Sequence, residues 1–295
     1  MALKVNLDAL IPRLDFEAEE SPSVNLGTQI DSFSISDLKR KAFFFLSLRK
    51  PDFQRETSEW EARKISDFIA SFVEGDLIPA IILWKSPSGL TFIVDGSHRI
   101  SALAAWINDD YGDGEITREF YDGMIPRDQI DIALKTRSLI EKTVGRFENY
   151  QLATENPDQA YPELLTRARK LATLSIHLQW VPGNAPKAEQ SFFKINQQAT
   201  PIDKTEEKIL KARRKPNGIA ARAIMRGGRG HKYWGSFSKE NQEKIESLAG
   251  EIRDILFIPE FESPIKSLDL PIAGKAYSGQ TLPLVLDFIG MVHKG

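Results

Sequence analysis

A β-branched run that ends in a glycine turn and passes directly into an alanine-rich stretch constrains the fold more than any other feature. The run is Phe92–Val94, the turn is Asp95–Arg99, and the alanine-rich stretch reaches Trp106. The pattern predicts a strand, a tight turn and a helix in immediate succession. Because the first turn of a helix has N–H groups without intrahelical partners and a positive dipole end, this turn is suited to bind phosphate.

The residues of the turn strengthen the phosphate interpretation. Gly96 permits a positive φ or the close approach of a ligand, and Ser97, His98 and Arg99 add hydrogen-bond donors. Asp95 would hold a divalent cation such as Mg²⁺ or orient Arg99 through a salt bridge. Since an imidazole changes its charge near neutral pH, His98 would bind phosphate or transfer a proton. The alternative is an ordinary tight turn in which Asp95 caps the helix.

Asp95–Arg99 resembles the DGQHR or DGQQR signature of the ParB/sulfiredoxin-like superfamily, and it departs from that signature at Ser97, where glutamine is usual. The group includes the N-terminal domain of GmrSD-type restriction enzymes and the DndB and DpdB proteins of DNA-modification and phage-defence clusters. Two other segments resemble the family in the same order, over about residues 40–215. They are Phe53-Gln54-Arg55 with Trp60, similar to Q-R-x-x-x-W, and Phe193–Asn196 with Pro201, Ile202 and Glu206, similar to F-x-x-I-N, P-L and E.

The resemblance implies a nucleotide-binding, NTP-hydrolysing component of a DNA-modification or restriction (phage-defence) system, an ATPase-like hydrolase that uses Mg²⁺ with ATP or another NTP. The expected partners are the nucleotide, DNA and other proteins of such a cluster. The expected nucleotide or phosphate contacts are Gln54, Arg55, Gly96, Ser97, His98, Arg99 and Asn196, and the expected catalytic residues are Asp95, His98 and Glu206. Arg55 and Arg99 suit phosphate because a guanidinium presents paired donors. Glu206 is a candidate for positioning a water or the hydration shell of Mg²⁺.

Two alternatives to this enzyme remain open. Resemblance to DndB implies a DNA-binding regulator without turnover, and the restriction context also admits a DNA nuclease. The chain has no identifiable H-N-H element and no clustered acidic triad. It also lacks a Walker A sequence, so the nucleotide interpretation rests on the turn and on the resemblance.

Periodicity elsewhere predicts an α+β fold, a small mixed sheet flanked by helices and followed by a mainly helical C-terminal region. The expected strands are 80–84, 90–94 and 173–180, with a turn at 86–89, and the expected helices include 60–72, 186–197 and 238–256. Phe43–Leu46 is expected to be buried. The expected domains are an N-terminal arm (1–30), a ParB/sulfiredoxin-like nucleotide-binding domain (31–215) and a helical region (216–295) that would fit a chain continuing beyond Gly295.

Positive charge is concentrated in one stretch of a chain whose net charge is only −2. Residues 208–232 contain nine lysines and arginines and no acidic residue. The expected DNA contacts there are Arg213, Arg214, Lys215, Arg222, Arg226, Arg229 and Lys232. The rings of His231, Tyr233 and Trp234 are suited to stack on unpaired bases. The alternative is a solvated basic face.

Two further features limit the function classes. The loop 108–115 alternates acids and glycines, which admits a calcium site or a solvated loop, although it lacks the full EF-hand pattern. The chain has no cysteine, which rules out disulfides, thiolate metal sites and a cysteine nucleophile. It shows neither a signal-peptide core nor an apolar run long enough to cross a bilayer, so we expect a cytoplasmic protein without a membrane partner.

Overall fold

The computed structural model describes residues 4–14, 16, 29–54, 57, 60–199, 212–257 and 281–292. The chain divides into two compact units, Met1–Pro201 and Ile202–Gly295. This division lies earlier than the domain boundary expected after residue 215. The charged segment 200–215 is also expected to contain a helix from about Pro201, and this segment lies mostly outside the described residues.

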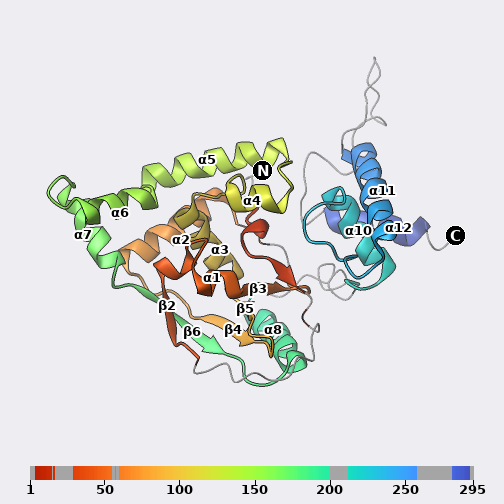
Figure 1. The fold of residues 1–295 in the computed structure, drawn as a ribbon, viewed down its shortest axis with the longest axis horizontal. Helices are drawn as coiled ribbons and strands as arrows, with labels where there is room; N and C mark the ends of the chain where they lie inside the picture. Colours follow the sequence, from red (N-terminus) through yellow and green to blue (C-terminus); the bar gives the residue numbers. More distant parts are fainter. Residues whose placement is uncertain are drawn as a thin grey trace, which may run out of the picture. The chain divides into compact units, whose positions relative to one another are not determined.

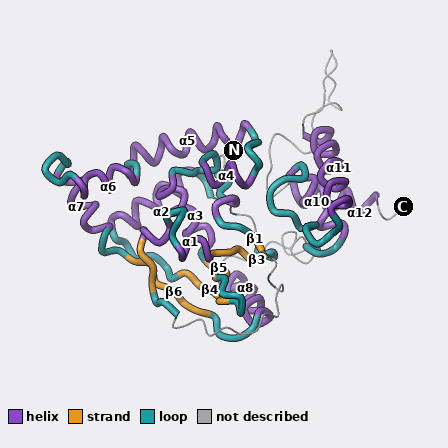
Figure 2. The backbone as a smooth tube through the Cα atoms, in the orientation of Figure 1, coloured by secondary structure: helices purple, strands orange, loops and turns teal. Residues whose placement is uncertain are grey.

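Unit 1 is built on a six-stranded mixed sheet of order β1-β3-β5-β4-β6-β2. The strands are β1 (Arg13–Leu14), β2 (Ser32–Ser34), β3 (Leu48–Pro51), β4 (Ile81–Lys85), β5 (Thr91–Asp95) and β6 (Ser175–Trp180). β1, β3 and β5 run parallel, β4 is antiparallel to β5, β6 is parallel to β4, and β2 is antiparallel to β6. Figure 2 shows these strands together, with helices packed around them. β3 and β5 therefore end at the same edge of the sheet.

The helices of unit 1 cover the sheet and one another (Figure 1). The short 3₁₀ helices are η1 (Asp8–Leu10) and η2 (Ile35–Leu38), and the α-helices are α1 (Phe43–Ser47), α2 (Ala62–Glu74), α3 (Ser97–Asn108), α4 (Glu115–Phe120), α5 (Arg127–Thr143), α6 (Phe147–Glu155), α7 (Pro162–Leu171) and α8 (Ala185–Ala199). α3 is buried on almost every side and contacts α2, α6, η1 and η2. Its alanines allow these neighbours to approach closely, because they add little side-chain volume.

The sheet is buried on both faces, and β5 contributes to each. Ile93 and its cross-strand neighbour Leu83 belong to the aliphatic core that the helices complete. Phe92 and its neighbour Trp84 point to the opposite face, where their ring centroids are 5.6 Å apart. Phe16 packs on both rings of that second, aromatic layer. A strand covered on both sides positions whatever follows it firmly, and the residues that follow β5 are the predicted phosphate turn.

The elements confirm the expected mixed sheet, flanking helices and helical C-terminal region. The three expected strands and the expected helices that are described end within about two residues of their predicted bounds. β1, β2 and β3 were not predicted, because two to four residues are too few to show alternation. The expectation that Phe43–Leu46 is buried is wrong in part. α1 turns Phe45 into the core and leaves Phe43 92% exposed.

Residues 4–14 differ from the expected N-terminal arm, since they are integrated into unit 1. Val5, Leu7, Leu10 and Ile11 are all buried in the aliphatic core. β1 extends the sheet beside β3, and Pro12 O accepts a hydrogen bond of 2.9 Å from Lys50 N. The acidic stretch at 17–20, which gave the segment its arm-like composition, lies outside the described residues.

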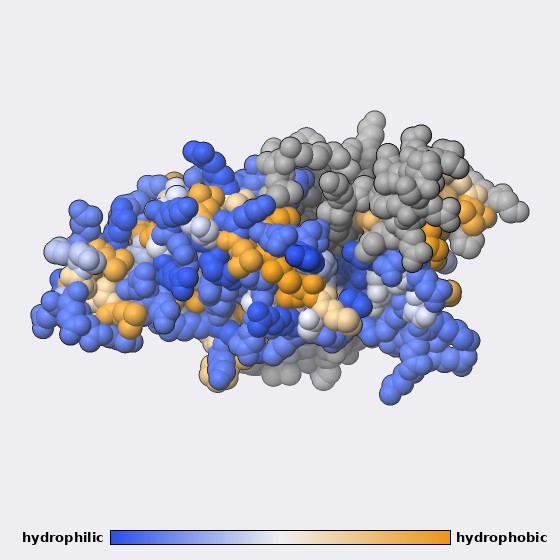
Figure 3. Space-filling view, turned by 90° about the horizontal axis from the view of Figure 1, so that it is seen from above, coloured by the Kyte–Doolittle hydropathy of each residue, from blue (hydrophilic) through white to orange (hydrophobic). Residues whose placement is uncertain are grey.

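Unit 2 is helical in its described part. It contains α10 (Pro216–Arg226), α11 (Lys239–Phe257) and α12 (Thr281–Val292), with α10 in contact with both others. Its core includes Met225, Trp234 and Leu286. The face of the whole molecule that is seen in Figure 3 is mostly hydrophilic among the described residues, with apolar residues exposed over part of it. No helix among the described residues combines the length and apolarity needed to cross a bilayer.

Candidate functional site

The strand, turn and helix predicted around Asp95–Arg99 are confirmed. β5 ends at Asp95, Gly96 has φ +97°, and α3 begins at Ser97. Ile100 N donates to Gly96 O at 3.0 Å, the first hydrogen bond of the helix. Gly96 is therefore the N-cap, and the alternative in which Asp95 caps the helix is wrong.

Glycine is required at the N-cap for two reasons. A positive φ is strained for a residue with a side chain. A Cβ atom on Gly96 would also lie 2.4 Å from Ile81 Cδ1 and 3.1 Å from Arg99 Nη2. β4 and the Arg99 side chain thus pack directly over this glycine and fix the angle at which α3 leaves the sheet.

Asp95 orients Arg99, which was one of its two expected roles. Arg99 Nη2 lies 2.6 Å from Asp95 Oδ2, and Arg99 Nη1 donates to Pro79 O at 2.7 Å. The guanidinium therefore joins the start of α3 to the end of β5 and to the residues before β4. Whether Arg99 also contacts phosphate, and whether Asp95 holds Mg²⁺, stay predictions.

The tryptophan of the second motif lies against the histidine of the turn. The rings of Trp60 and His98 are stacked, with centroids 5.6 Å apart and an interplanar angle of 24°. Lys64 Nζ lies 4.9 Å from the Trp60 ring centroid, and Phe68 meets the same ring edge-on. Two motifs separated by more than thirty residues in the sequence thus meet at one end of β5.

Gln54 lies just beyond the end of β3, on the edge of the sheet that also carries the turn. It is only 5% exposed, and its Oε1 atom has no hydrogen-bond partner in the described part of the chain. A buried carbonyl oxygen without a partner is unfavourable by roughly 1–3 kcal/mol, so this oxygen is poised to accept a hydrogen bond. Arg55, the next expected contact, lies outside the described residues.

The third motif reaches the same part of the sheet through α8, which contacts β5. The Phe53 ring lies 5.0 Å from that of Phe192 and 6.1 Å from that of Phe193, measured between centroids. Asn196 belongs to the last turn of α8, and its side chain lies outside the described residues. Glu206 lies outside them as well. The structure thus brings parts of all three motifs together.

A cluster of charged residues beneath Gln54 was not among the expected site residues. Asp8, Arg13 and Lys50 are all buried, and Asp8 Oδ1 lies 2.8 Å from Arg13 Nη2 and 2.6 Å from Lys50 Nζ. The sequence holds one signal of this cluster, because Asp8 and Arg13 interrupt an otherwise apolar stretch at 7–14. Charged residues are seldom fully buried unless they are paired.

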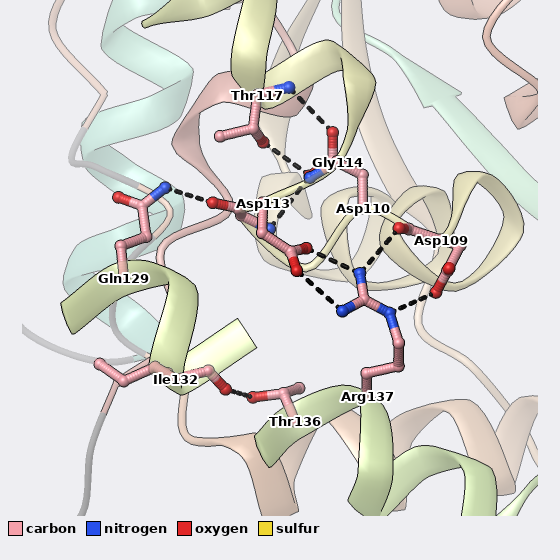
Figure 4. Close-up of polar contacts among 10 residues, drawn as sticks. Asp109, Asp110, Asp113, Gly114, Thr117, Gln129, Ile132, Thr136 and Arg137 are labelled. Atoms are coloured by element: carbon pink, nitrogen blue, oxygen red, sulfur yellow. Dashed lines mark hydrogen bonds and ion pairs between the residues drawn. The ribbon is translucent and has the colours of Figure 1, made fainter. Parts of the chain in front are cut away.

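The acidic loop 108–115 is neither the calcium site nor the solvated loop that its composition admitted. Figure 4 shows Arg137 between Asp109 and Asp113, with its guanidinium bound to both carboxylates. The buried Asp110 accepts hydrogen bonds from four donors of the loop and of the first turn of α4. The hydrogen bond with Asp113 raises the pKa of Arg137, and burial raises the pKa of Tyr111. The carboxylates thus stabilise the loop by binding Arg137 and the N–H and O–H donors of the loop and of α4. No group of potential metal ligands occurs within the described ranges.

The basic stretch of unit 2 divides into buried and exposed cations. Arg222 is 5% exposed, with its guanidinium 4.2 Å from the Tyr233 ring centroid, and Arg226 lies 5.7 Å from the same ring. Lys232 pairs with Glu246 at 2.6 Å. The exposed cations of the described part include Arg214, Lys215, Arg229 and Lys232, and Arg213 is half-buried.

The expectation that Trp234 offers its ring to a base is wrong. Trp234 is fully buried in the core of unit 2 and donates from Nε1 to Glu246 Oε1 at 3.1 Å. His231 and Tyr233 are half-buried, with their ring centroids 4.6 Å apart and nearly perpendicular. DNA binding by this stretch stays a prediction that now rests on the exposed cations.

The family comparison agrees with the three motifs. Residues 35–215 match the model of the GmrSD restriction endonuclease N-terminal domain. No curated protein and no solved structure matches the chain. The match connects the chain with restriction and phage-defence systems. It spans more than half of the sequence and includes the Gln54 segment, the Asp95–Arg99 turn and α8, so the chain belongs to the family of the GmrSD restriction endonuclease N-terminal domain.

Proposed function

We propose that unit 1 binds a nucleoside triphosphate at the edge of the sheet where β3 and β5 end, and hydrolyses it as part of a restriction or phage-defence system. One observation carries this proposal. The Gln54 segment and the Asp95–Arg99 turn follow parallel neighbouring strands at this edge, and Trp60 of the Gln54 motif stacks on His98 of the turn. Phosphate would lie over the first turn of α3, where N–H groups and the helix dipole favour an anion.

The side chains present fit a nucleotide better than an inorganic anion alone. The buried Gln54 Oε1 atom is an acceptor, and phosphate at neutral pH offers mainly acceptors. A hydroxyl or amino group of the nucleoside supplies the missing donor. The Trp60 ring stacks on His98 and would hold this imidazole in place beside the ligand.

The residues of the turn suggest how hydrolysis would proceed. His98, in the first turn of α3, would transfer a proton to or from the attacking water or bind the transferred phosphate. The Oδ2 atom of Asp95 accepts a hydrogen bond from Arg99, and its Oδ1 atom would contact Mg²⁺. Mg²⁺ usually takes one or two carboxylates together with substrate phosphates, so one carboxylate is compatible with that mode. The ion would neutralise phosphate charge.

Calorimetry with ATP and with GTP, in the presence of Mg²⁺, tests binding by the full chain. His98→Ala should weaken binding or turnover by at least tenfold, whereas His177→Ala should change neither, because His177 is exposed on β6. Phosphate release with and without DNA then tests hydrolysis. A wild-type protein that binds neither nucleotide would refute the proposal. A protein that binds a nucleotide without releasing phosphate would refute hydrolysis and support nucleotide binding alone.

A second function, DNA binding by unit 2, has its own observation in its favour. The exposed cations Arg214, Lys215 and Arg229 lie in a stretch without acidic residues. Such a surface suits the phosphate backbone, and its affinity would fall with salt. DNA binding without nucleotide hydrolysis would favour the DNA-binding regulator, and cleavage of the bound DNA would favour the nuclease.

A further inference from the structure

Residues 4–14, which precede the family match at 35–215, lie along the connection between β3 and α2. Val5 N donates to Trp60 O and Leu7 N donates to Thr57 O, each at 2.9 Å. The same segment also pairs with β3 through β1 (Figure 2). The segment therefore touches both ends of the connection that carries the second motif.

Asp8 is the centre of these contacts. Its Oδ1 atom accepts from Thr57 N at 3.1 Å and lies within 2.8 Å of Arg13 Nη2 and Lys50 Nζ. The three partners belong to the motif connection, to β1 and to β3. One buried carboxylate thus sets the distance between the end of the sheet and the connection that leaves it.

Arg13 holds the turn that carries Gln54. Its Nη1 atom donates to Pro51 O at 3.1 Å and also to Gln54 O. The turn itself is closed by Gln54 N, which donates to Pro51 O at 3.1 Å. The carbonyl groups of the first and last residues of this turn are therefore fixed by a guanidinium that precedes the residues of the family match.

The far end of the connection leads back to the turn after β5. Trp60 accepts the hydrogen bond from Val5 and stacks on His98. A shift of the connection against β3 would move Gln54 and Trp60 together relative to the Asp95–Arg99 turn. The geometry of the site thus depends on contacts made by the N-terminal segment.

We propose that Asp8 and Arg13 are positioning residues of the candidate site, holding Gln54 and Trp60 in place against the Asp95–Arg99 turn. Residues 4–14 thereby set the geometry of the site in addition to filling the core. The inference rests on the proposed function in one respect, the identity of the ligand as a nucleoside triphosphate.

Loss of stability alone does not test this role, because removing Asp8 leaves two buried cations without their shared acceptor. A suitable variant is Arg13→Lys, which keeps the charge but lacks the two separate nitrogens, one that bonds the Pro51 and Gln54 carbonyls and one that bonds Asp8. Asp8→Asn is the second variant. The matched control is Ile11→Val, which removes a buried methylene from the same segment without touching a polar contact.

The first measurement needs no ligand. The chain has four histidines, so NMR of the labelled rings gives few signals. His98 lies in the ring current of Trp60, so its signal should shift in Arg13→Lys and in Asp8→Asn and stay in place in Ile11→Val. His177 should not move in any variant. All spectra are taken at one temperature and one pH, well below the lowest melting temperature among the variants. An unmoved His98 signal in the folded Arg13→Lys variant, or an equal shift in Ile11→Val, would overturn the proposal.

The second measurement uses ATP with Mg²⁺ and the full chain. Arg13→Lys should weaken ATP binding by about tenfold, while Ile11→Val should bind like wild type. Equal affinities in Arg13→Lys and wild type would overturn the positioning role. If wild type binds no nucleotide, the proposed function fails, and the His98 signal still decides whether Arg13 positions the site.

Discussion

Gly96→Ala should destabilise unit 1 through two separable effects. The residue would keep φ near +97°, a conformation that costs a residue with a side chain roughly 1–3 kcal/mol. Its Cβ would lie 2.4 Å from Ile81 Cδ1, and relieving such an overlap in a packed core costs about 1–3 kcal/mol more. We therefore expect a loss of about 2–6 kcal/mol in the free energy of unfolding.

Two comparisons separate the effects. Gly123 has φ +80°, and a Cβ added there would have nothing within 4 Å, so Gly123→Ala should show the backbone strain alone. Ile81→Val removes the atom that the new methyl group at position 96 would meet, and by itself it costs about 0.5–1.5 kcal/mol. The double variant Gly96→Ala with Ile81→Val should thus be less destabilised than the sum of the single variants by about 1–3 kcal/mol.

The assay is urea unfolding followed by tryptophan fluorescence. Four of the five tryptophans, all except Trp234, lie in unit 1, so the signal reports mainly on that unit. Equal m-values among the variants are required, since a changed slope would indicate a changed unfolding reaction. Additivity of the two single changes within about 0.5 kcal/mol would refute the packing of Ile81 over Gly96 as the reason for this glycine.

Three further predictions address other parts of the molecule. Burial raises the pKa of Tyr111, so its contribution to stability is complete below the unfolded pKa of about 10 and is lost as pH rises above it. By pH 11 this loss should amount to about 1.4 kcal/mol in the free energy of unfolding. Urea unfolding at pH 9 and pH 11 measures the loss, which should be smaller in Tyr111→Phe than in the wild type. Asp110→Ala removes the acceptor for four donors and should destabilise unit 1 by more than about 2 kcal/mol in the same assay. Replacing Arg214, Lys215 and Arg229 with alanine should flatten the plot of log DNA affinity against log salt by roughly 0.9 per lost contact. An unchanged slope would mean that these cations do not touch DNA.

The sequence is sufficient to predict those strands, turns and helices whose signals lie within the element itself. The β-branched run before Asp95, the glycine after it and the alanines beyond gave a strand, a turn and a helix that the structure confirms. The alternation at 173–180 likewise gave β6. Each signal lies within one element, so no knowledge of tertiary neighbours was needed.

The roles of individual charges depended on distant neighbours and were harder to predict. Arg222 counted as one of nine cations suited to DNA, but the fold buries it against Tyr233. The carboxylates of the loop at 108–115 suggested a cation, and Arg137 from α5 supplies one. In both places the residue types indicate a site for a partner outside the chain. In the structure a side chain of the same chain, Tyr233 or Arg137, makes the contact instead.

The cluster of Asp8, Arg13 and Lys50 could not be predicted from the sequence, because its residues come together only in the folded sheet. Asp8 and Lys50 are 42 residues apart, and only the pairing of β1 with β3 brings them together. Replacing a buried ion group of this kind with well-packed apolar residues is often neutral or stabilising. Its presence is therefore poorly explained by stability alone. Hydrogen bonds to charged groups are directional, and those made by Asp8 and Arg13 end on the connection that carries Gln54 and Trp60. What the cluster provides beyond stability is a fixed geometry at the end of the sheet where a ligand would bind.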